Sequence, residues 1–443
     1  MTPTLLLFAL TGLLTLGMLT VLYVRAPSVG VALLLTAGLW PAARSETVVH
    51  LGVSLTPQDL LVSCALAAAG VNLVRRPPRA HRALLLLSLI LLLTAGSFLV
   101  GAAVFGPQAA GNDMRMPFLY VFGLALYGIT LPYTAPLVHR LAAVWVVAAC
   151  VETLWAVLWW TEHGIGSAVG QVVIDGLASE SRALSAPEAL LIAQAAMILL
   201  YATPLGARRH LLAAPLLLTV VLLQHRTVWL VTAVMLACWL ITGTGAGNAS
   251  ARGRRGLRLG LTAAGLCLGA FAVSTGLLGR FGTGLTVSAS DSGTLAWRAT
   301  GWYGLLSTLD GAGEWLTGRP FGAGFDRLVD GRVVGVSPHN YFLHLLLRIG
   351  LLGLLAFLAL YAAVLAPALR RDADLTSRAL GMLACGQLVY ALTYQVFPEQ
   401  GLVLGVLCAL GVGLAPHLAP SGPTGPASPP PDPTRAPPTA QLR

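Results

Sequence analysis

The sequence predicts an all-α protein, a polytopic transmembrane helical bundle of about 12 or 13 spans with one large extracytoplasmic loop. Two observations predict this fold class. Hydrophobic residues make up 56% of the 443 residues and charged residues only 10%, whereas soluble domains carry about 25% charged residues. The apolar residues also fall in runs close to the roughly 20 residues that a helix needs to cross a hydrocarbon core of ~30 Å. Together these observations exclude a soluble fold.

The apolar runs define one membrane domain, residues 1–419. Its predicted spans are 4–24, 28–44, 57–74, 83–105, 117–135, 141–160, 187–205, 211–225, 227–243, 258–277, 339–367, 379–397 and 401–418. The first run has neither a preceding basic segment nor a convincing small-residue cleavage site, so we expect a retained span rather than a signal peptide. Residues 420–443 are rich in proline and poor in apolar side chains, which predicts a disordered cytoplasmic tail.

Arginine clusters predict which loops face the cytoplasm. All 27 basic residues are arginine, and clusters of arginine occur in every second loop, near residues 75–82, 140, 208–209, 252–258 and 370–378. Cytoplasmic loops carry this excess of positive charge. The opposite, extracytoplasmic face is therefore predicted to receive the loops near 106–116, 161–186, 225–227, 276–338 and 397–400.

The same arginine pattern accounts for the formal net charge of +10 without a nucleic-acid partner. The lack of lysine, together with abundant Ala, Gly, Leu and Pro, is typical of a GC-rich bacterial genome. We therefore expect a multi-pass protein of a bacterial inner membrane, in contact with the lipid bilayer.

The cysteines and glycines give no sign of a metal or nucleotide site. Each of the six cysteines lies in an apolar stretch, without a CxxC pair or a Cys/His spacing suited to a metal. The glycines of GRPFGAGFD at 318–326 follow no predicted strand and precede no Lys-Ser/Thr pair, so a nucleotide-binding loop is unsupported. We predict no metal and no cofactor.

Most of the polar residues that bear on function lie in four motifs in the second half of the chain. SPHNYFLHLLLRIGLLGLL at 337–355 sets a polar Ser-Pro-His-Asn start before an apolar, glycine-bearing helix. GRPFGAGFD lies upstream in the loop 276–338. That loop carries enough aromatic surface to pack a small lid against the membrane, in Trp297, Trp302, Tyr303, Trp315, Phe321 and Phe325. Two arginine motifs come earlier still, QHRTVWL at 224–230 and AWRATGW at 296–302.

In these motifs and in their order the chain resembles the O-antigen ligase/polymerase superfamily. The resemblance implies a GT-C-like, metal-independent glycosyltransferase whose core spans about 211–397. Such an enzyme moves a glycan from an undecaprenyl-diphosphate carrier to a saccharide acceptor on the extracytoplasmic face. The residues it implies are His339, Arg226 and Arg298 for catalysis, and Asn340, Gly322, Gly324, Arg319 and Arg348 for substrate binding. One departure is the His-Arg-Thr context of Arg226, where relatives often have a preceding small residue and a following glycine.

The chemistry of these side chains suits that activity. Arginine meets phosphate oxygens with two parallel hydrogen bonds, so Arg226 and Arg298 are expected to stabilise the charge that grows on the leaving diphosphate. Histidine has an ordinary pKa near 6.5, which suits His339 to accept the proton of the attacking hydroxyl. We expect a supporting role for Asn340.

Each of these residues also has a structural interpretation. His339 is a polar residue at a helix start, and Arg226 is an arginine that reaches the membrane interface. Other arginines of the same loop could take the role assigned to Arg298, and aspartates close to it in sequence could pair with it. Arg348 lies inside an apolar helix, so it needs a polar partner or a position inside the bundle.

The sequence leaves the acceptor open. A lipid A core sugar makes the protein a ligase, a second carrier-linked repeat makes it a polymerase, and a protein hydroxyl makes it an O-oligosaccharyltransferase. The other alternative is a polysaccharide or lipid transporter, which predicts ionisable residues near the middle of spans and broken helices in both halves. The enzyme instead predicts that Arg226, Arg298 and His339 meet in one outward-facing cavity.

Overall fold

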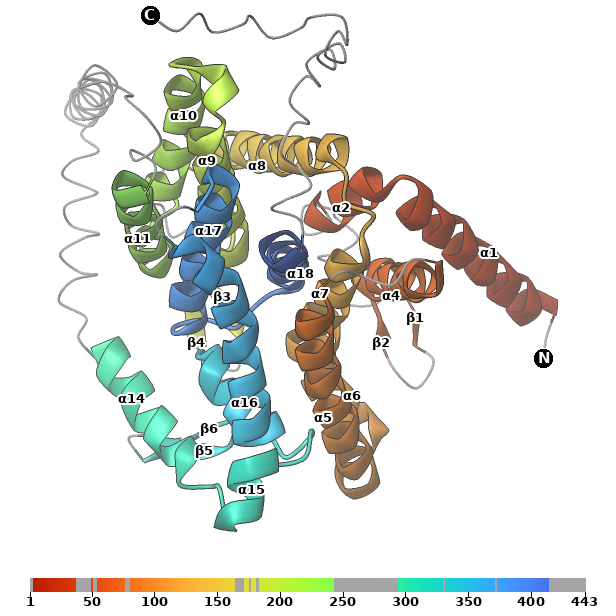
Figure 1. Ribbon diagram of the computed structural model, residues 1–443. Coiled ribbons are helices and arrows are strands. Elements are labelled where there is room, and N and C mark those ends of the chain that lie inside the picture. Colours follow the sequence, from red (N-terminus) through yellow and green to blue (C-terminus); the bar gives the residue numbers. More distant parts are fainter. Residues whose placement is uncertain are drawn as a thin grey trace, which may run out of the picture.

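The computed structural model describes residues 3–36, 49–50, 54–75, 80–163, 171–174, 177–180, 183–242, 293–329, 331–370 and 373–413. Within these ranges the chain is almost entirely helical (Figure 1). The described strands form three two-stranded hairpins: β1–β2 (Val49–His50 and Ser54–Leu55), β3–β4 (Gln171–Ile174 and Leu177–Glu180) and β5–β6 (Arg327–Val329 and Arg332–Val334). The predicted all-α class is confirmed.

Several described helices are long and apolar enough to cross a membrane. They are α4 (Pro57–Arg75), α5 (His81–Phe105), α8 (Ala135–His163) and α16 (Tyr341–Ala368). All four coincide with predicted spans. A further candidate is the pair α1 (Pro3–Arg25) and α2 (Pro27–Thr36), which is bent by 117°. Such helices are what a multi-pass membrane protein requires.

Shorter helices occupy most of the other predicted spans. They are α7 (Val121–Thr130), α9 (Ala186–Tyr201), α10 (Arg208–Leu222), α11 (Arg226–Thr242), α17 (Leu375–Ala391) and α18 (Pro398–Gly413). The predicted span 258–277 and the predicted tail 420–443 lie outside the described residues. The total of 12 or 13 spans stays a prediction.

Small residues let α7 and α18 approach closely. Gly401 and Gly405 lie about one turn apart on α18, and a Cβ at either position would overlap a backbone carbonyl of α7, that of Val121 or of Ala125. Gly128 on α7 faces Gly405 in turn. Close backbone packing through glycine is a common way for helices to associate in lipid, where the hydrophobic effect does not drive them together.

α16 is broken near its first third. Gly350 has non-helical torsions, with φ 66° and ψ −171°, and glycine reaches positive φ without the steric cost of a Cβ. A Cβ there would overlap the Leu316 carbonyl of α15 (Gly311–Thr317). Beside the break, the Leu347 carbonyl accepts a hydrogen bond from the Arg319 N–H at 2.7 Å. The predicted span is therefore an apolar helix, but one interrupted where the preceding loop touches it.

The predicted extracytoplasmic loop carries α14 (Gly293–Leu306), α15 and the hairpin β5–β6, which gather at one end of the molecule (Figure 1). α14 packs on β5, and α15 packs on α16. Phe321 is fully buried in the helical core, and Trp302 and Phe325 pack with apolar residues of α14 and α16. Aromatic side chains thus hold this part of the loop against the first turns of α16, and a lid that packs against the membrane stays a prediction. Residues 276–292 lie outside the described ranges.

Candidate active site

The backbone at His339 is strained and is held on both sides. Its φ is +48°, in the left-handed region that residues other than glycine rarely adopt. Trp302 Nε1 on α14 donates a hydrogen bond to the Pro338 carbonyl at 2.6 Å. Asn340 then caps α16, its Oδ1 accepting the Leu343 N–H at 3.0 Å. Strained residues persist only where their surroundings fix them, and they concentrate at functional sites.

Two arginines set the charge around His339. Arg298 on α14 and Arg327 on β5 both act on it electrostatically, and the His339 side chain is partly exposed. Burial, followed by the two cations, lowers the pKa of His339, because each of these effects disfavours the imidazolium form. At neutral pH His339 is therefore uncharged and able to accept a proton.

The two predicted arginines differ in how the structure relates them to His339. Arg298 is close enough to influence its charge, whereas Arg226 is the exposed first residue of α11. The residue after it, Thr227, shares a hydrogen bond with Thr393 at 2.9 Å between their hydroxyl oxygens. Tyr394 follows Thr393, and its ring lies 6.5 Å from that of His339. These contacts connect the first turn of α11 with the ring of His339, and the meeting of all three predicted side chains in one cavity stays a prediction.

Arg327 joins this site, although no motif distinguished it from the other loop arginines. It is only 7% exposed. Its Nη1 donates to two carbonyls, that of Phe325 at 3.0 Å and that of Val336 at 2.7 Å, and its guanidinium lies 6.0 Å from the centre of the Trp297 ring. Arg327 therefore ties the glycine-rich segment to the residues just before His339.

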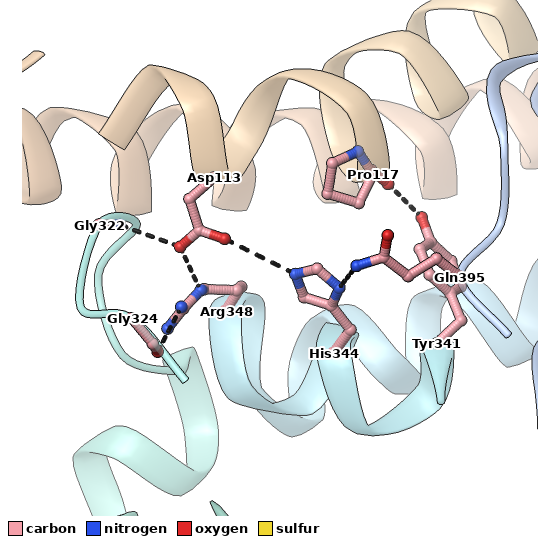
Figure 2. Close-up of polar contacts among 8 residues, drawn as sticks. All are labelled: Asp113, Pro117, Gly322, Gly324, Tyr341, His344, Arg348 and Gln395. Carbon is pink, nitrogen blue, oxygen red and sulfur yellow. Dashed lines mark hydrogen bonds and ion pairs between the residues drawn. The ribbon is translucent and has the colours of Figure 1, made fainter. Parts of the chain in front are cut away.

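A second polar cluster lies inside the molecule between α6 (Pro107–Met114) and α16 (Figure 2). Arg348 Nε forms an ion pair with Asp113 Oδ2 at 2.7 Å, and Arg348 Nη2 donates to the Gly324 carbonyl at 2.7 Å. The same Asp113 oxygen accepts the Gly322 N–H at 3.0 Å. These four residues, Asp113, Gly322, Gly324 and Arg348, are called the clamp below.

His344 extends the clamp along α16. Its Nε2 lies 3.8 Å from Asp113 Oδ1, and its Nδ1 lies 3.3 Å from Gln395 Nε2. Figure 2 shows the His344 ring between these two side chains. The Phe325 ring meets His344 edge-on at 5.0 Å between centroids and lies 4.2 Å from the Arg348 guanidinium. The polar cluster is therefore enclosed by aromatic surface.

Asp113 is charged within the clamp. Burial by itself raises the pKa of a carboxyl group, but the contacts with His344, Arg348 and the Gly322 N–H outweigh it, so the pKa of Asp113 is lowered. Arg348 is 1% exposed, and its pairing with Asp113 allows it to lie inside an apolar helix bundle. The expectation that Arg348 needs a polar partner is confirmed.

Three residues predicted to bind substrate, Gly322, Gly324 and Arg348, belong to the clamp, and a fourth, Arg319, acts on Arg348 electrostatically. The contacts described above turn the polar groups of Gly322, Gly324 and Arg348 toward the protein. Both glycines have positive φ, +90° and +71°, which favours glycine at these turns. Their contacts give these residues a role in shaping the loop, and direct contact with substrate stays a prediction.

Asp113 was missed by sequence reasoning. It lies in GNDMRM at 111–116, inside the predicted loop 106–116, where the structure instead has α6. The available signal was Arg348 itself, because an arginine in an apolar helix needs an acidic or carbonyl partner. A lone aspartate beside another apolar span is such a partner, but only the fold selects it among the other carboxylates.

The described residues hold no group of three or more His, Cys, Asp or Glu side chains placed to bind a metal ion. Neither a protein-family model nor a curated protein matches the chain. The resemblance to the O-antigen ligase/polymerase superfamily therefore rests on the motifs and their order, and the function drawn from it is a proposal.

Proposed function

We propose that the chain is a membrane glycosyltransferase that moves a glycan from an undecaprenyl-diphosphate carrier to a saccharide acceptor, on the extracytoplasmic face of a bacterial inner membrane. The observation that carries this proposal is the neutral, partly exposed His339, held in a strained conformation beside the cation of Arg298. The transfer needs such a pair, because it removes a proton from one oxygen and leaves negative charge on another. The order of the four motifs gives further support.

In the proposed reaction, the acceptor oxygen forms a bond to C1 of the donor sugar. The bond between C1 and the diphosphate oxygen breaks, and its electron pair leaves with undecaprenyl diphosphate. His339 accepts the proton of the acceptor hydroxyl and later releases it to solvent. Arg298 and Arg226 meet the leaving diphosphate with charge-assisted hydrogen bonds, so the proposal needs no metal ion.

Three kinds of acceptor are compatible with the proposed reaction. A lipid A core sugar, a second carrier-linked repeat and a protein hydroxyl each present an oxygen nucleophile to the same donor. In the proposed reaction His339 accepts a proton from each of these nucleophiles in the same way. The residues around His339 therefore do not distinguish the three acceptors. We place the saccharide acceptor first because the resemblance implies it.

A transporter is the second candidate, and two observations favour it. α16 is broken at Gly350, and α1 and α2 form a bent pair in the other half of the chain. Arg348 is also a buried ionisable residue within an apolar helix. It lies seven residues after the start of α16, however, so the clamp is about 10 Å from the end of the helix and not at its middle. This position favours the enzyme.

The test is transfer by the purified full chain in liposomes. The donor is an undecaprenyl-diphosphate-linked oligosaccharide, and separate arms offer a lipid A core, a second carrier-linked repeat and a serine-containing protein. We expect transfer in one arm, with a loss of about 10²-fold or more in His339→Ala and of similar size in Arg298→Ala. Arg332→Ala removes an exposed arginine of β6 and is expected to keep the wild-type rate. Movement of the donor across the bilayer without transfer in any arm would favour the transporter.

A further inference from the structure

The clamp fixes two backbone groups of the glycine-rich segment from outside that segment. Asp113 accepts the Gly322 N–H, and Arg348 donates to the Gly324 carbonyl. The two charged side chains are only 11% and 1% exposed, and their ion pair joins α6 to α16 across the segment (Figure 2). Two helices from distant parts of the chain therefore hold the same turn.

The held segment continues into the backbone that precedes His339. Phe325, adjacent to Gly324, presents its carbonyl to Arg327 Nη1, and the same nitrogen donates to the Val336 carbonyl. His339 follows three residues later. A displacement of the glycine-rich turn would therefore be passed through Arg327 to the start of α16.

A buried ion pair is a weak source of stability, because removing two charges from water offsets most of their attraction. An apolar pair of similar volume would hold α6 against α16 about as well. Such a pair would not bind the Gly322 N–H or the Gly324 carbonyl, however. The charged pair is therefore suited to fixing the loop backbone more than to stabilising the bundle.

Resting on the transfer function proposed above, we propose that Asp113 is a positioning residue of that reaction: through Arg348 and the glycine-rich turn it fixes the backbone that carries His339. Asp113 itself lies in the enclosed cluster and has no role in contacting substrate. Misplacement of a reacting group by about 1 Å costs on the order of 10²-fold in rate. Loss of the clamp is therefore expected to lower kcat and to leave KM for the donor nearly unchanged.

Two variants and one matched control test the proposal. Asp113→Asn keeps the shape of the side chain and removes its charge, but it leaves Arg348 buried without a counterion. The double variant Asp113→Leu with Arg348→Met removes both charges, so it avoids that cost while losing both hydrogen bonds to the loop. Asp59→Asn breaks another aspartate–arginine pair, Asp59 with Arg115 at 3.3 Å. Asp59 Oδ2 also accepts the Thr56 N–H at 2.6 Å, so this pair holds the start of α4 and, among the described residues, no backbone group of 318–340.

Two measurements are made on the purified full chain. The first separates kcat from KM in the transfer assay, and the second follows amide hydrogen exchange by mass spectrometry over residues 318–340. We expect the two variants to lose protection both at 322–327 and at 336–340, and the double variant to lose about 10²-fold in kcat with KM within about twofold. Asp59→Asn is expected to change neither measurement.

The outcomes separate the two proposals. A wild-type chain that transfers no glycan in any acceptor arm overturns the proposed function, and exchange needs no substrate. An active wild type with unchanged kcat in a folded double variant overturns the positioning role alone. Lost protection at 322–327 with full protection at 336–340 also overturns it, because the turn would then not be coupled to His339.

Discussion

Two polar regions lie against the first turns of α16, and they differ in how their charges are matched. In the clamp, the guanidinium of Arg348 meets the carboxylate of Asp113 at 2.7 Å and a carbonyl on its other side. Around His339, two arginines act on one imidazole, and no ion pair to either arginine forms among the described residues. The clamp is enclosed, whereas His339 and Arg298 are partly exposed.

The difference indicates what each region is suited to do. A charge that already has its counterion gains little from a ligand, and its removal leaves the partner buried and unpaired. Positive charge without a counterion raises the local concentration of anions, such as a lipid-linked diphosphate. The clamp is therefore expected to respond to mutation through stability and geometry, and the surroundings of His339 through transfer.

The largest expected effect on stability is at the clamp. Arg348→Ala leaves Asp113 buried without its cation, so we expect a loss of about 3–5 kcal/mol in the free energy of unfolding. Arg298→Ala removes a partly exposed cation that forms no ion pair within the described ranges and is expected to change the free energy of unfolding by less than about 0.5 kcal/mol. Chemical unfolding in detergent measures both. Equal losses in the two variants would remove the distinction between the regions.

A smaller effect is expected at the break in α16. Gly350→Ala places a Cβ against the Leu316 carbonyl at a backbone φ of +66°. We expect a loss of about 1–3 kcal/mol in the same unfolding measurement, because the loop and helix must separate to make room. Gly96→Ala on α5 is the control, since a Cβ there meets nothing within 4 Å. A loss in the control as large as in Gly350→Ala would contradict this explanation.

Trp302→Phe tests how the strained backbone at His339 is held. The variant loses the hydrogen bond to the Pro338 carbonyl, which is expected to cost about 0.5–1.5 kcal/mol in unfolding free energy. Transfer is expected to fall, because the peptide before His339 is then free to relax. Trp315→Phe changes a tryptophan of α15 that is 43% exposed and is expected to affect neither. Equal transfer rates in the two variants would show that this hydrogen bond does not position His339.

The smallest expected effect is a shift in the pH dependence of transfer. Neutral His339 is the active form, so the rate is expected to fall as pH drops through its lowered pKa, with a midpoint below the ordinary value of 6.5. Arg298→Gln removes a cation that disfavours the imidazolium. The pKa of His339 then rises, and the midpoint of the remaining activity moves to higher pH. A midpoint that stays fixed or moves down would contradict the electrostatic contact.

Apolar run length predicted much of the fold. The expected spans 57–74 and 83–105 match α4 and α5 to within two residues at each end, because a long apolar helix leaves a strong local signal. The break in α16 left no such signal. Glycine is common in membrane helices, and the conformation of Gly350 depends on a loop that packs against it.

The candidate site was predictable in part for the same reason. His339 and Asn340 are recognisable in the sequence as polar residues directly before an apolar helix. Arg348 lies inside that helix, and a charged residue there requires a polar partner. The identity of that partner is a long-range property: Asp113 contacts Gly322 from 209 positions earlier in the chain. Likewise Arg327 differs from the other loop arginines only by where the hairpin β5–β6 places it.

Rescue of His339→Gly by added imidazole tests the central claim most directly, because it replaces only the missing base. Purified variant chain is assayed in liposomes with the lipid-linked donor and the acceptor that the wild type uses, over a series of imidazole concentrations and pH values. We predict a nearly inactive variant whose transfer returns in proportion to the neutral imidazole present, with no effect of imidazole on the wild type. A His339→Gly chain that transfers glycan at the wild-type rate without imidazole would contradict it.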